Sequence, residues 1–270
     1  MAKFSFVIPT FNRKQNLQRT LWALCLQTDK DFEVVISDDG STDGTAEMVK
    51  EYVKHLRLKY YWQEDKGYRV SLTRNQGTRL TDRNSSHIWY IDSDVLLNKG
   101  AVAFARGLCA RHSQAVIAGR YDWLPPMVIT LEDIAERFDL IAKGKLPKAE
   151  AQGDCYRNFK PDHRAAIAPF DSETPKLSGS TLSGNLIVPR IWLDRGFDEN
   201  IEDQGQDGEF GHHMRELGVK SILCDKIIGY HQSHYADNAW KTQSVQKTIK
   251  YILNKYRHHF SEEQLKKAGL

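Results

Sequence analysis

Short apolar runs alternate with helical patterns along the first 120 residues of the chain. The runs are rich in β-branched and aromatic residues and end at Gly, Asp or Pro, which is typical of buried strands. Between them, apolar residues recur at helical spacing, as at Leu17, Leu21 and Leu24. This alternation predicts an α/β fold with a mostly parallel central sheet flanked by helices. The predicted strands are Phe4–Ile8, Phe32–Ser37, Lys59–Trp62, Ile88–Ile91 and Ala115–Ala118.

The pattern changes after Tyr121. Prolines gather around Asp122–Pro126 and Pro161–Pro175, which favours a loop-rich insertion or lid, interrupted by one helix at Leu131–Lys143. Regular patterns then return, and we expect a single domain with two halves, residues 1–120 and 121–270. The elements expected after the insertion are a strand at Leu182–Val188, a helix at Asp207–Leu217, a strand at Ser221–Leu223 and a last helix at Ala239–His258.

Composition excludes several classes of protein. The 38 Lys and Arg residues are nearly matched by 35 Asp and Glu residues, so a strongly basic nucleic-acid binder is not expected. Four dispersed cysteines, without a C-x-x-C pair, indicate neither a disulfide framework nor a structural zinc site. The start lacks the long apolar segment of a signal peptide, and no run of about eighteen apolar residues occurs. We therefore expect a cytoplasmic protein.

Two carboxylates, Asp38 and Asp39, end the second predicted strand. A carboxylate at this position can accept a hydrogen bond from a nucleobase N–H or a ribose hydroxyl. The residues that follow have a simpler interpretation, because Ser41, Thr42 and Asp43 are suited to capping the next helix. The pair Asp38 and Asp39 thus predicts a nucleoside-binding turn.

Two further acids, Asp92 and Asp94, follow the fourth predicted strand. Residues i and i+2 of an extended segment point the same way, so both carboxylates can face one divalent cation that also holds phosphate oxygens. Lys66 and Arg74 lie between the two acidic pairs in the sequence and can offset the charge of a diphosphate. Single basic residues are more often solvated, but Arg74 in Arg-Asn-Gln-Gly has no obvious ion-pairing neighbour.

Four motifs taken in order, Phe6–Asn12, Val35–Thr45, Arg74–Gly77 and Asp92–Asp94, resemble those of the family-2 glycosyltransferases with the GT-A fold. The resemblance covers the first half of the chain. It implies that the first strand end and the Asp-Asp-Gly-Ser turn hold a nucleoside and that the D-x-D motif holds Mn²⁺ or Mg²⁺ on the diphosphate. The donor-binding residues implied are Pro9, Thr10, Asn12, Asp38, Asp39, Lys66, Arg74, Asp92 and Ser93.

The segment Gly205–Gly211 is similar to the carboxyl-terminal segment of galactosyltransferase-like and chondroitin-polymerase-like enzymes. That similarity implies that Asp207 is the catalytic base, although Gln206 replaces the usual Glu. The alternative is that Asp207 and Glu209 only begin a helix, where acids are favoured by the helix dipole. The residues expected at the acceptor are Glu209, Gly184 and Trp123.

Most of the ten histidines are expected to be ordinary polar residues. His231 follows a short predicted strand, and the resemblance implies a histidine in this region as a further metal ligand beside Asp92 and Asp94. His234 is the alternative ligand. Carboxylate suits Mn²⁺ better than imidazole does, but imidazole is tolerated.

The resemblance as a whole implies transfer of a sugar from a UDP-sugar, of the Gal, GalNAc or GlcNAc type, to an acceptor hydroxyl with inversion. Residues 1–120 would bind the donor, and residues 121–270 would bind a saccharide or lipid-linked saccharide acceptor in polysaccharide or glycoconjugate synthesis.

The last helix is amphipathic, which favours docking on its own domain; the alternative is peripheral contact with the inner face of a membrane. Two other functions remain open: a sugar-phosphate nucleotidyltransferase, which normally has a Gly-rich loop absent here, and a non-catalytic sugar-nucleotide-binding protein.

Overall fold

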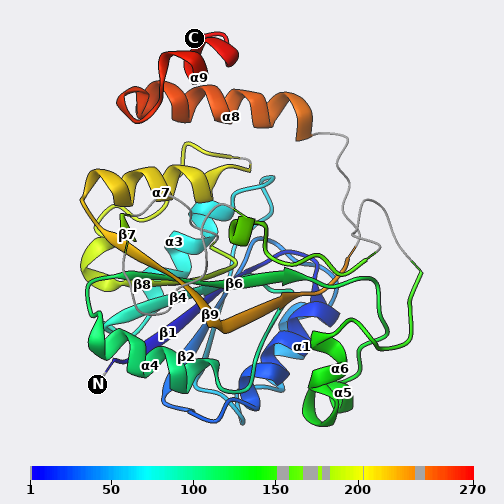
Figure 1. The fold of residues 1–270 in the computed structure, drawn as a ribbon. Coiled ribbons are helices and arrows are strands. Elements are labelled where there is room, and N and C mark those ends of the chain that lie inside the picture. The colour runs from blue at the N-terminus through cyan, green and yellow to red at the C-terminus, as the bar shows by residue number, and fades with distance from the viewer. Residues whose placement is uncertain (1, 151–157, 167–175, 178–182, 203, 235–240) are drawn as a thin grey trace.

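The computed structural model describes residues 2–150, 158–166, 176–177, 183–202, 204–234 and 241–270. Its strands are β1 (Phe4–Thr10), β2 (Phe32–Asp38), β3 (Leu58–Trp62), β4 (His87–Ile91), β5 (Val95–Leu97), β6 (Val116–Trp123), β7 (Lys176–Leu177), β8 (Asn185–Pro189) and β9 (Lys220–His231). They form one sheet in the order β3-β2-β1-β4-β8-β6-β9-β5, and β7 pairs with β9 (Figure 1). Strands β1 to β4 are parallel to one another, as are β6 and β9, whereas β5, β7 and β8 run antiparallel to their neighbours.

The sheet confirms the predicted α/β class with a mixed, mostly parallel sheet. The five strands expected in the first half are present, and β6 continues to Trp123, so that one strand crosses the boundary expected at residue 120. The strand expected at Ser221–Leu223 is part of the longer β9. Leu182, the expected start of another strand, lies outside the described residues. The two halves of the chain therefore share one sheet.

Helices cover both faces of this sheet. They are α1 (Lys14–Cys25), α2 (Thr45–Lys50), α3 (Val70–Leu80), α4 (Ala101–Arg111), α5 (Leu131–Glu136), α6 (Phe138–Ala142), α7 (Gln206–Glu216), α8 (Lys241–Lys255) and α9 (Glu262–Lys267). Helices α1 and α4 lie on one face, α3 and α7 lie on the other, and α8 lies beyond α7 (Figure 1).

Two helix predictions differ from the structure. The single helix expected at Leu131–Lys143 is divided into α5 and α6, because the backbone of Arg137 is not helical (φ −123°, ψ 31°). The last helix was expected to run to His258, but α8 ends at Lys255 and a separate 3₁₀ turn follows at Arg257–His259. The first two residues of that expected helix lie outside the described part of the chain.

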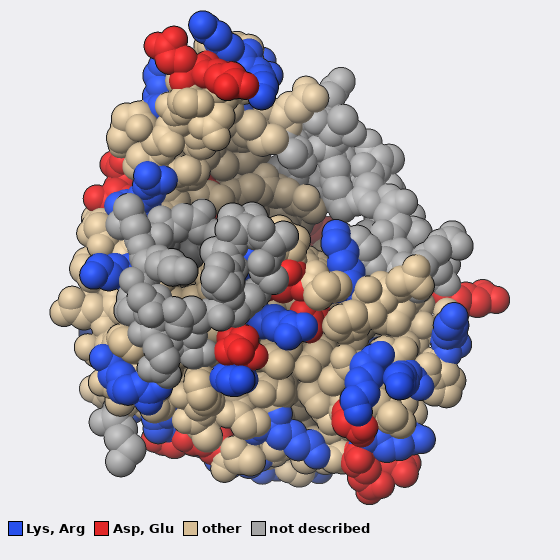
Figure 2. Space-filling model, viewed as in Figure 1, with Lys and Arg blue, Asp and Glu red and all other residues tan. Residues whose placement is uncertain are grey.

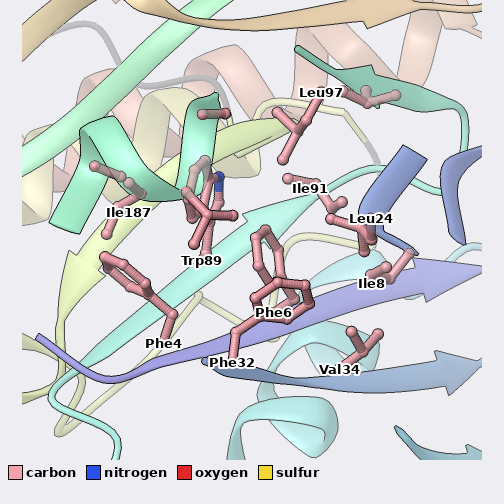
Figure 3. Close-up of a cluster of buried hydrophobic side chains, with 14 of the residues drawn as sticks. Phe4, Phe6, Ile8, Leu24, Phe32, Val34, Trp89, Ile91, Leu97 and Ile187 are labelled. Carbon is pink, nitrogen blue, oxygen red and sulfur yellow. The ribbon is translucent and has the colours of Figure 1, made fainter. Parts of the chain in front are cut away.

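Side chains of β1 and β4 alternate between two buried layers. Phe6 and Trp89 point into the layer under α1 and α4, where their rings stack with centroids 4.7 Å apart (Figure 3). Val7 and Tyr90 point into the opposite layer, which α7 covers with Phe210. Strands buried on both faces are typical of parallel sheets. The rigid sheet fixes where each strand ends, and the site lies at those ends.

Charges of both signs are interspersed over the molecular face drawn in Figure 2. The pattern follows from the near balance of 38 basic and 35 acidic residues. Among the described residues of this face, no single-sign patch that would attract a polyanion is seen. Within the described part of the chain, no helix combines the length and the apolar character needed to cross a membrane.

Candidate active site

The predicted donor-binding motifs lie along one edge of the sheet. Strands β1, β2 and β4 are parallel, so their carboxyl ends point the same way. Thr10, the last residue of β1, is in register with Asp38, the last residue of β2. The backbone N–H of Asp39 donates to the carbonyl oxygen of Thr10 at 2.9 Å. Asp92 follows directly after β4, which brings the second acidic motif to the same edge.

Asp38 holds the turn after β2. Its Oδ1 accepts hydrogen bonds from the backbone N–H groups of Gly40 and Ser41 at 3.1 and 2.7 Å. Its Oδ2 accepts a hydrogen bond of 2.7 Å from the hydroxyl of Tyr60. Burial, and then the Asp38 carboxylate, raise the pKa of Tyr60, so its hydroxyl stays a donor. Asp38 is fully buried, and its hydrogen bonds stabilise the conformation of this turn.

Asp39 has a different environment. Its Oδ1 accepts hydrogen bonds from Gln63 Nε2 at 2.6 Å and from Arg69 Nη2 at 2.5 Å. Arg69 is thus the cation that pairs with Asp39. The Lys66 side chain is 65% exposed and pairs with Glu64 at 3.2 Å. Among the described residues, the hydrogen bonds to the Asp39 side chain fall on Oδ1 alone.

The other residues expected to bind the donor lie at the ends of β1 and β4. The side-chain hydroxyl of Thr10 is buried and has no hydrogen-bond partner in the described part of the protein. Pro9 is buried in β1, next to Thr10. Asn12 adopts a left-handed backbone conformation (φ 49°), and its Oδ1 accepts from the N–H of Thr42 at 2.9 Å. The carbonyl oxygen of Ser93 accepts a hydrogen bond from Thr20 on α1 at 3.0 Å.

Arg74 on α3 connects the two halves of the site. It is 2% exposed, and its Nη2 donates to Asp92 Oδ1 at 2.8 Å while its Nη1 lies 3.9 Å from Asp207 Oδ1. Burial acts to lower the pKa of Arg74, but the charges of Asp92 and Asp207 raise it above its usual value. Gly77, one turn further along α3, lets the helix lie against β1, since a Cβ there would be 2.6 Å from Val7 Cγ1.

Both carboxylate oxygens of Asp92 accept hydrogen bonds from neighbouring side chains. Besides Arg74, the hydroxyl of Tyr121 donates to Asp92 Oδ2 at 3.1 Å. Gly184 makes this contact possible, because a Cβ there would lie 2.6 Å from Asp92 Oδ2 and 2.3 Å from a Tyr121 ring carbon. The Trp123 ring packs edge-on against Tyr121, with centroids 5.0 Å apart. Burial raises the pKa of Asp92, and Arg74 opposes this effect.

Asp94, His231 and His234 converge beside Asp92. Their ligand atoms all lie within 4.8 Å of one another. Asp94 Oδ2 is 2.9 Å from His234 Nε2 and 3.5 Å from His231 Nε2, and β5 brings them together by pairing with the end of β9. Burial acts to raise the pKa of Asp94, but the two imidazoles outweigh it and hold that pKa well below its usual range. The structure thus brings together both histidines that the sequence offered as alternatives.

A pocket of about 490 Å³ adjoins this cluster. Its wall includes His234 and three cations from the start of α1, namely Arg13, Lys14 and Arg19. Arg13 Nη2 lies 3.1 Å from His234 Nδ1. Positive charge beside a set of metal ligands suits an anionic group such as a phosphate.

Asp207 lies in the first turn of α7 and faces Arg74. Its Oδ1 accepts hydrogen bonds from the backbone N–H of Ser183, at 3.2 Å, and from the Ser183 hydroxyl. The Asp207 side chain is 26% exposed, so it is accessible to a ligand. The base predicted from the sequence and Asp92 of the D-x-D motif therefore lie at the two terminal nitrogens of the Arg74 guanidinium.

Glu209 has a different position, although it was predicted beside the acceptor. Its side chain is fully buried and forms ion pairs with Arg195, at 2.8 Å, and with Lys255 of α8, also at 2.8 Å. The hydroxyl of Tyr256 donates to the same carboxylate at 2.6 Å. Burial acts to raise the pKa of Glu209, but these three partners lower it. The structure places this carboxylate against α8 rather than beside Asp207.

Several residues of the site were not predicted from the sequence, among them Tyr121, Ser183 and Arg69. A signal existed for Tyr121, because it is two residues before Trp123 on one strand and alternation places both on the same face. Arg69 was part of the string Lys66–Arg69, and only the fold shows which cation turns inward. For Ser183, which approaches Asp207 across 24 residues of sequence, no local pattern was present.

Comparisons with known proteins identify relatives of this chain. Residues 5–123 match the model of glycosyl transferase family 2. The chain is 33% identical over 247 residues to validoxylamine A glucosyltransferase of Streptomyces hygroscopicus subsp. jinggangensis, covering 85% of this chain and 55% of that protein. It is 30% identical over 241 residues to chondroitin synthase of Escherichia coli, covering 84% of this chain and 34% of that protein.

The fold is also similar to solved structures. GalNAc-T7, in a structure with UDP, GalNAc and Mn²⁺, superposes with a TM-score of 0.66 over 94% of this chain and 50% of that one, at 14% identity. The chain spans about half the length of validoxylamine A glucosyltransferase and a third of chondroitin synthase. The motifs, the fold and these matches together confirm the predicted family: the chain belongs to glycosyltransferase family 2 and has the GT-A fold.

Proposed function

We propose that the protein is a metal-dependent glycosyltransferase that moves a sugar from a UDP-sugar, of the Gal, GalNAc or GlcNAc type, to an acceptor hydroxyl with inversion. The observation that carries this proposal is the position of Arg74, which joins Asp92 of the D-x-D motif to Asp207. One buried cation thereby links the predicted diphosphate end of the site to the predicted base. Family membership and the UDP named in the GalNAc-T7 structure support the same conclusion.

The nucleoside binds at the ends of β1 and β2 in this proposal. Asp38 is engaged by the turn and by Tyr60, so we assign recognition of the base to Asp39. The buried hydroxyl of Thr10, without a partner among the described residues, supplies a second polar contact. The N3–H of uracil would donate to the Asp39 carboxylate, whereas cytosine has an unprotonated N3 at that place.

The metal ligands in the proposal are Asp94, His231 and His234. Their fit to a cation rests on Asp94 Oδ1, which is buried without a hydrogen-bond partner among the described residues, and on the convergence of all three side chains. Two imidazoles beside a carboxylate favour Mn²⁺ over Mg²⁺, and Mn²⁺ is named in the GalNAc-T7 structure. When bound, the ion would neutralise negative charge on the diphosphate. Asp92, which the sequence predicted as a metal ligand, has its two oxygens engaged by Arg74 and Tyr121 and would instead position Arg74, whose positive charge lies beside this cluster.

Asp207 acts as the general base. In the proposed step its carboxylate takes the proton of the acceptor hydroxyl while that oxygen forms a bond to the anomeric carbon and the bond to UDP breaks. Ser183 orients the carboxylate through its N–H and hydroxyl. Arg74 stabilises the negative charge of the departing diphosphate, since its guanidinium lies between Asp92 and Asp207.

The acceptor and the location of the protein are also proposals. A saccharide or lipid-linked saccharide would approach Asp207 from the side of Gly184 and Trp123. Helix α8 buries Ile252 and Leu253 against its own chain, while Ile249 is 47% exposed. This arrangement supports docking of α8 on the domain, and peripheral contact with the inner face of a membrane remains the second proposal for it.

A calorimetric titration with UDP and Mn²⁺ tests the donor site. Wild type should bind UDP more tightly than CDP, because CDP would place an acceptor against the Asp39 carboxylate. Asp39→Asn should remove that preference, and Asp94→Ala should weaken UDP binding in Mn²⁺. The exposed control Asp139→Asn should behave as wild type. Equal affinity for UDP and CDP in wild type would remove Asp39 from base recognition.

A further inference from the structure

A second group of metal-ligating side chains lies where the end of α7 meets the 3₁₀ turn Arg257–His259. Glu216 is the last residue of α7, and His258 and His259 belong to the turn that follows α8. The ligand atoms of these three residues lie within 4.8 Å of one another. His259 Nε2 is 3.0 Å from Glu216 Oε1, and His258 Nε2 contacts the same oxygen. Three donor atoms from two segments of the chain thus converge on one point.

A third histidine fixes the orientation of this group. His212 lies one turn before Glu216 on α7, and its Nδ1 is 3.0 Å from Nδ1 of His259. The two rings stack with centroids 5.2 Å apart. A histidine that binds metal through Nε2 usually donates its Nδ1–H to a nearby acceptor. His212 supplies that acceptor and keeps His259 Nε2 directed at Glu216.

We infer that Glu216, His258 and His259 form a second metal site, which takes a late first-row divalent cation such as Zn²⁺. Two imidazoles and one carboxylate are a ligand set typical of Zn²⁺. Ligand atoms around tetrahedral Zn²⁺ lie roughly 3.3 Å apart, so small movements of these side chains suffice. The His258 side chain is 64% exposed and that of Glu216 is 38% exposed, so a cation reaches the site from solvent and water completes its coordination.

The proposed ion would connect two parts of the protein. Glu216 ends the helix that begins beside Asp207, whereas His258 and His259 follow α8. A bound cation would therefore tie the segment after α8 to α7, in addition to the ion pair between Lys255 and Glu209. Metal that binds only the folded state stabilises that state. The site differs from the Asp94 cluster in lying at the opposite end of α7 from Asp207.

The inference is tested by counting bound zinc and by locating it. Titration calorimetry with ZnCl₂ should give one more equivalent for wild type than for His258→Asn or Glu216→Gln. The control His112→Asn should keep the wild-type stoichiometry, and Asp94→Ala should keep the equivalent that His258→Asn loses. His258 is largely exposed, so its replacement removes little packing.

Anomalous diffraction from crystals soaked in ZnCl₂ should show a peak between Glu216, His258 and His259. Equal zinc stoichiometry for wild type and His258→Asn would overturn the inference. So would zinc peaks confined to Asp94, His231 and His234, because the contacts at Glu216 would then be ordinary ion pairs between carboxylate and imidazole.

Discussion

Two acids in the first turn of α7, Asp207 and Glu209, have opposite environments. Asp207 is partly exposed and lies beside Arg74 and Ser183 at the edge of the sheet. Glu209 is fully buried and binds the cation of Lys255 on α8. Residues two positions apart on a helix point about 200° apart, so the helix separates the two carboxylates almost completely. One side of α7 therefore serves the proposed chemistry, and the other anchors the C-terminal helix.

The largest effect is expected from Asp207→Asn. This change keeps the shape of the side chain and removes its basicity, so the transfer rate should fall by a factor on the order of 10²–10⁴. Affinity for UDP should stay close to wild type, because a base that acts on the acceptor makes little contact with the nucleotide. Steady-state kinetics with calorimetry of UDP measure both, and Glu209→Gln is the matched control. If the control lost the larger share of the rate, the two roles would be exchanged.

Glu209→Ala should act on stability instead. It leaves the Arg195 and Lys255 cations without their buried carboxylate, which should lower the free energy of unfolding by about 3 kcal/mol. Urea denaturation measures this loss, and Glu262→Ala, an exposed acid on α9, serves as the control. A Glu209→Ala variant as stable as its control would contradict the anchoring role.

The same carboxylate should make stability depend on pH. The pKa of Glu209 is lowered in the folded state, so its contribution is fully present above the unfolded pKa of about 4.3 and is lost as the pH falls through the folded pKa. The difference in unfolding free energy between wild type and Glu209→Gln should therefore shrink in acid. Urea denaturation over a pH series measures it. A difference that stays constant down to the folded pKa would contradict the ion-paired state of Glu209.

Lys255→Met should give the smallest effect. The Lys255 side chain is 30% exposed, and Glu209 keeps Arg195 and Tyr256 when the ammonium is removed. We expect a loss of about 1 kcal/mol in the free energy of unfolding. Lys247→Met, at an exposed position of the same helix, is the matched control. A loss as large as that of Glu209→Ala would mean that Lys255 alone carries the attachment of α8.

Much of the fold was predictable from the spacing at which hydrophobic residues recur along the chain. The alternation of strand and helix patterns in residues 1–120 gave the strands that carry the donor motifs, because buried strands with short turns have strong local signals. The division of the helix at Arg137 and the length of β9 were missed. The length of β9 depends on its pairing with β5 and β6, which are distant in the sequence.

The candidate site was predictable only as a set of motifs. The spacing of two acids after a buried strand predicted Asp92 and Asp94, and resemblance supplied Asp207. The parallel strands explain why Asp92 and Asp94 share an edge with Asp39. The role of Glu209 was not predictable, although the helix around it was expected, because the sequence does not show which side of α7 faces α8. Its partner Lys255 is 46 residues away in the chain.

The central claim is that the cluster around Arg74 transfers a sugar from a UDP-sugar. Release of UDP from UDP-galactose, UDP-GalNAc and UDP-GlcNAc in Mn²⁺ tests it most directly, with Asp94→Ala and the exposed control Asp139→Asn measured in parallel. We expect wild type and the control to release UDP from at least one donor and Asp94→Ala to release almost none. Equal release by wild type and Asp94→Ala would rule out the proposed transfer, and so would binding of UDP-sugars by wild type without any release of UDP.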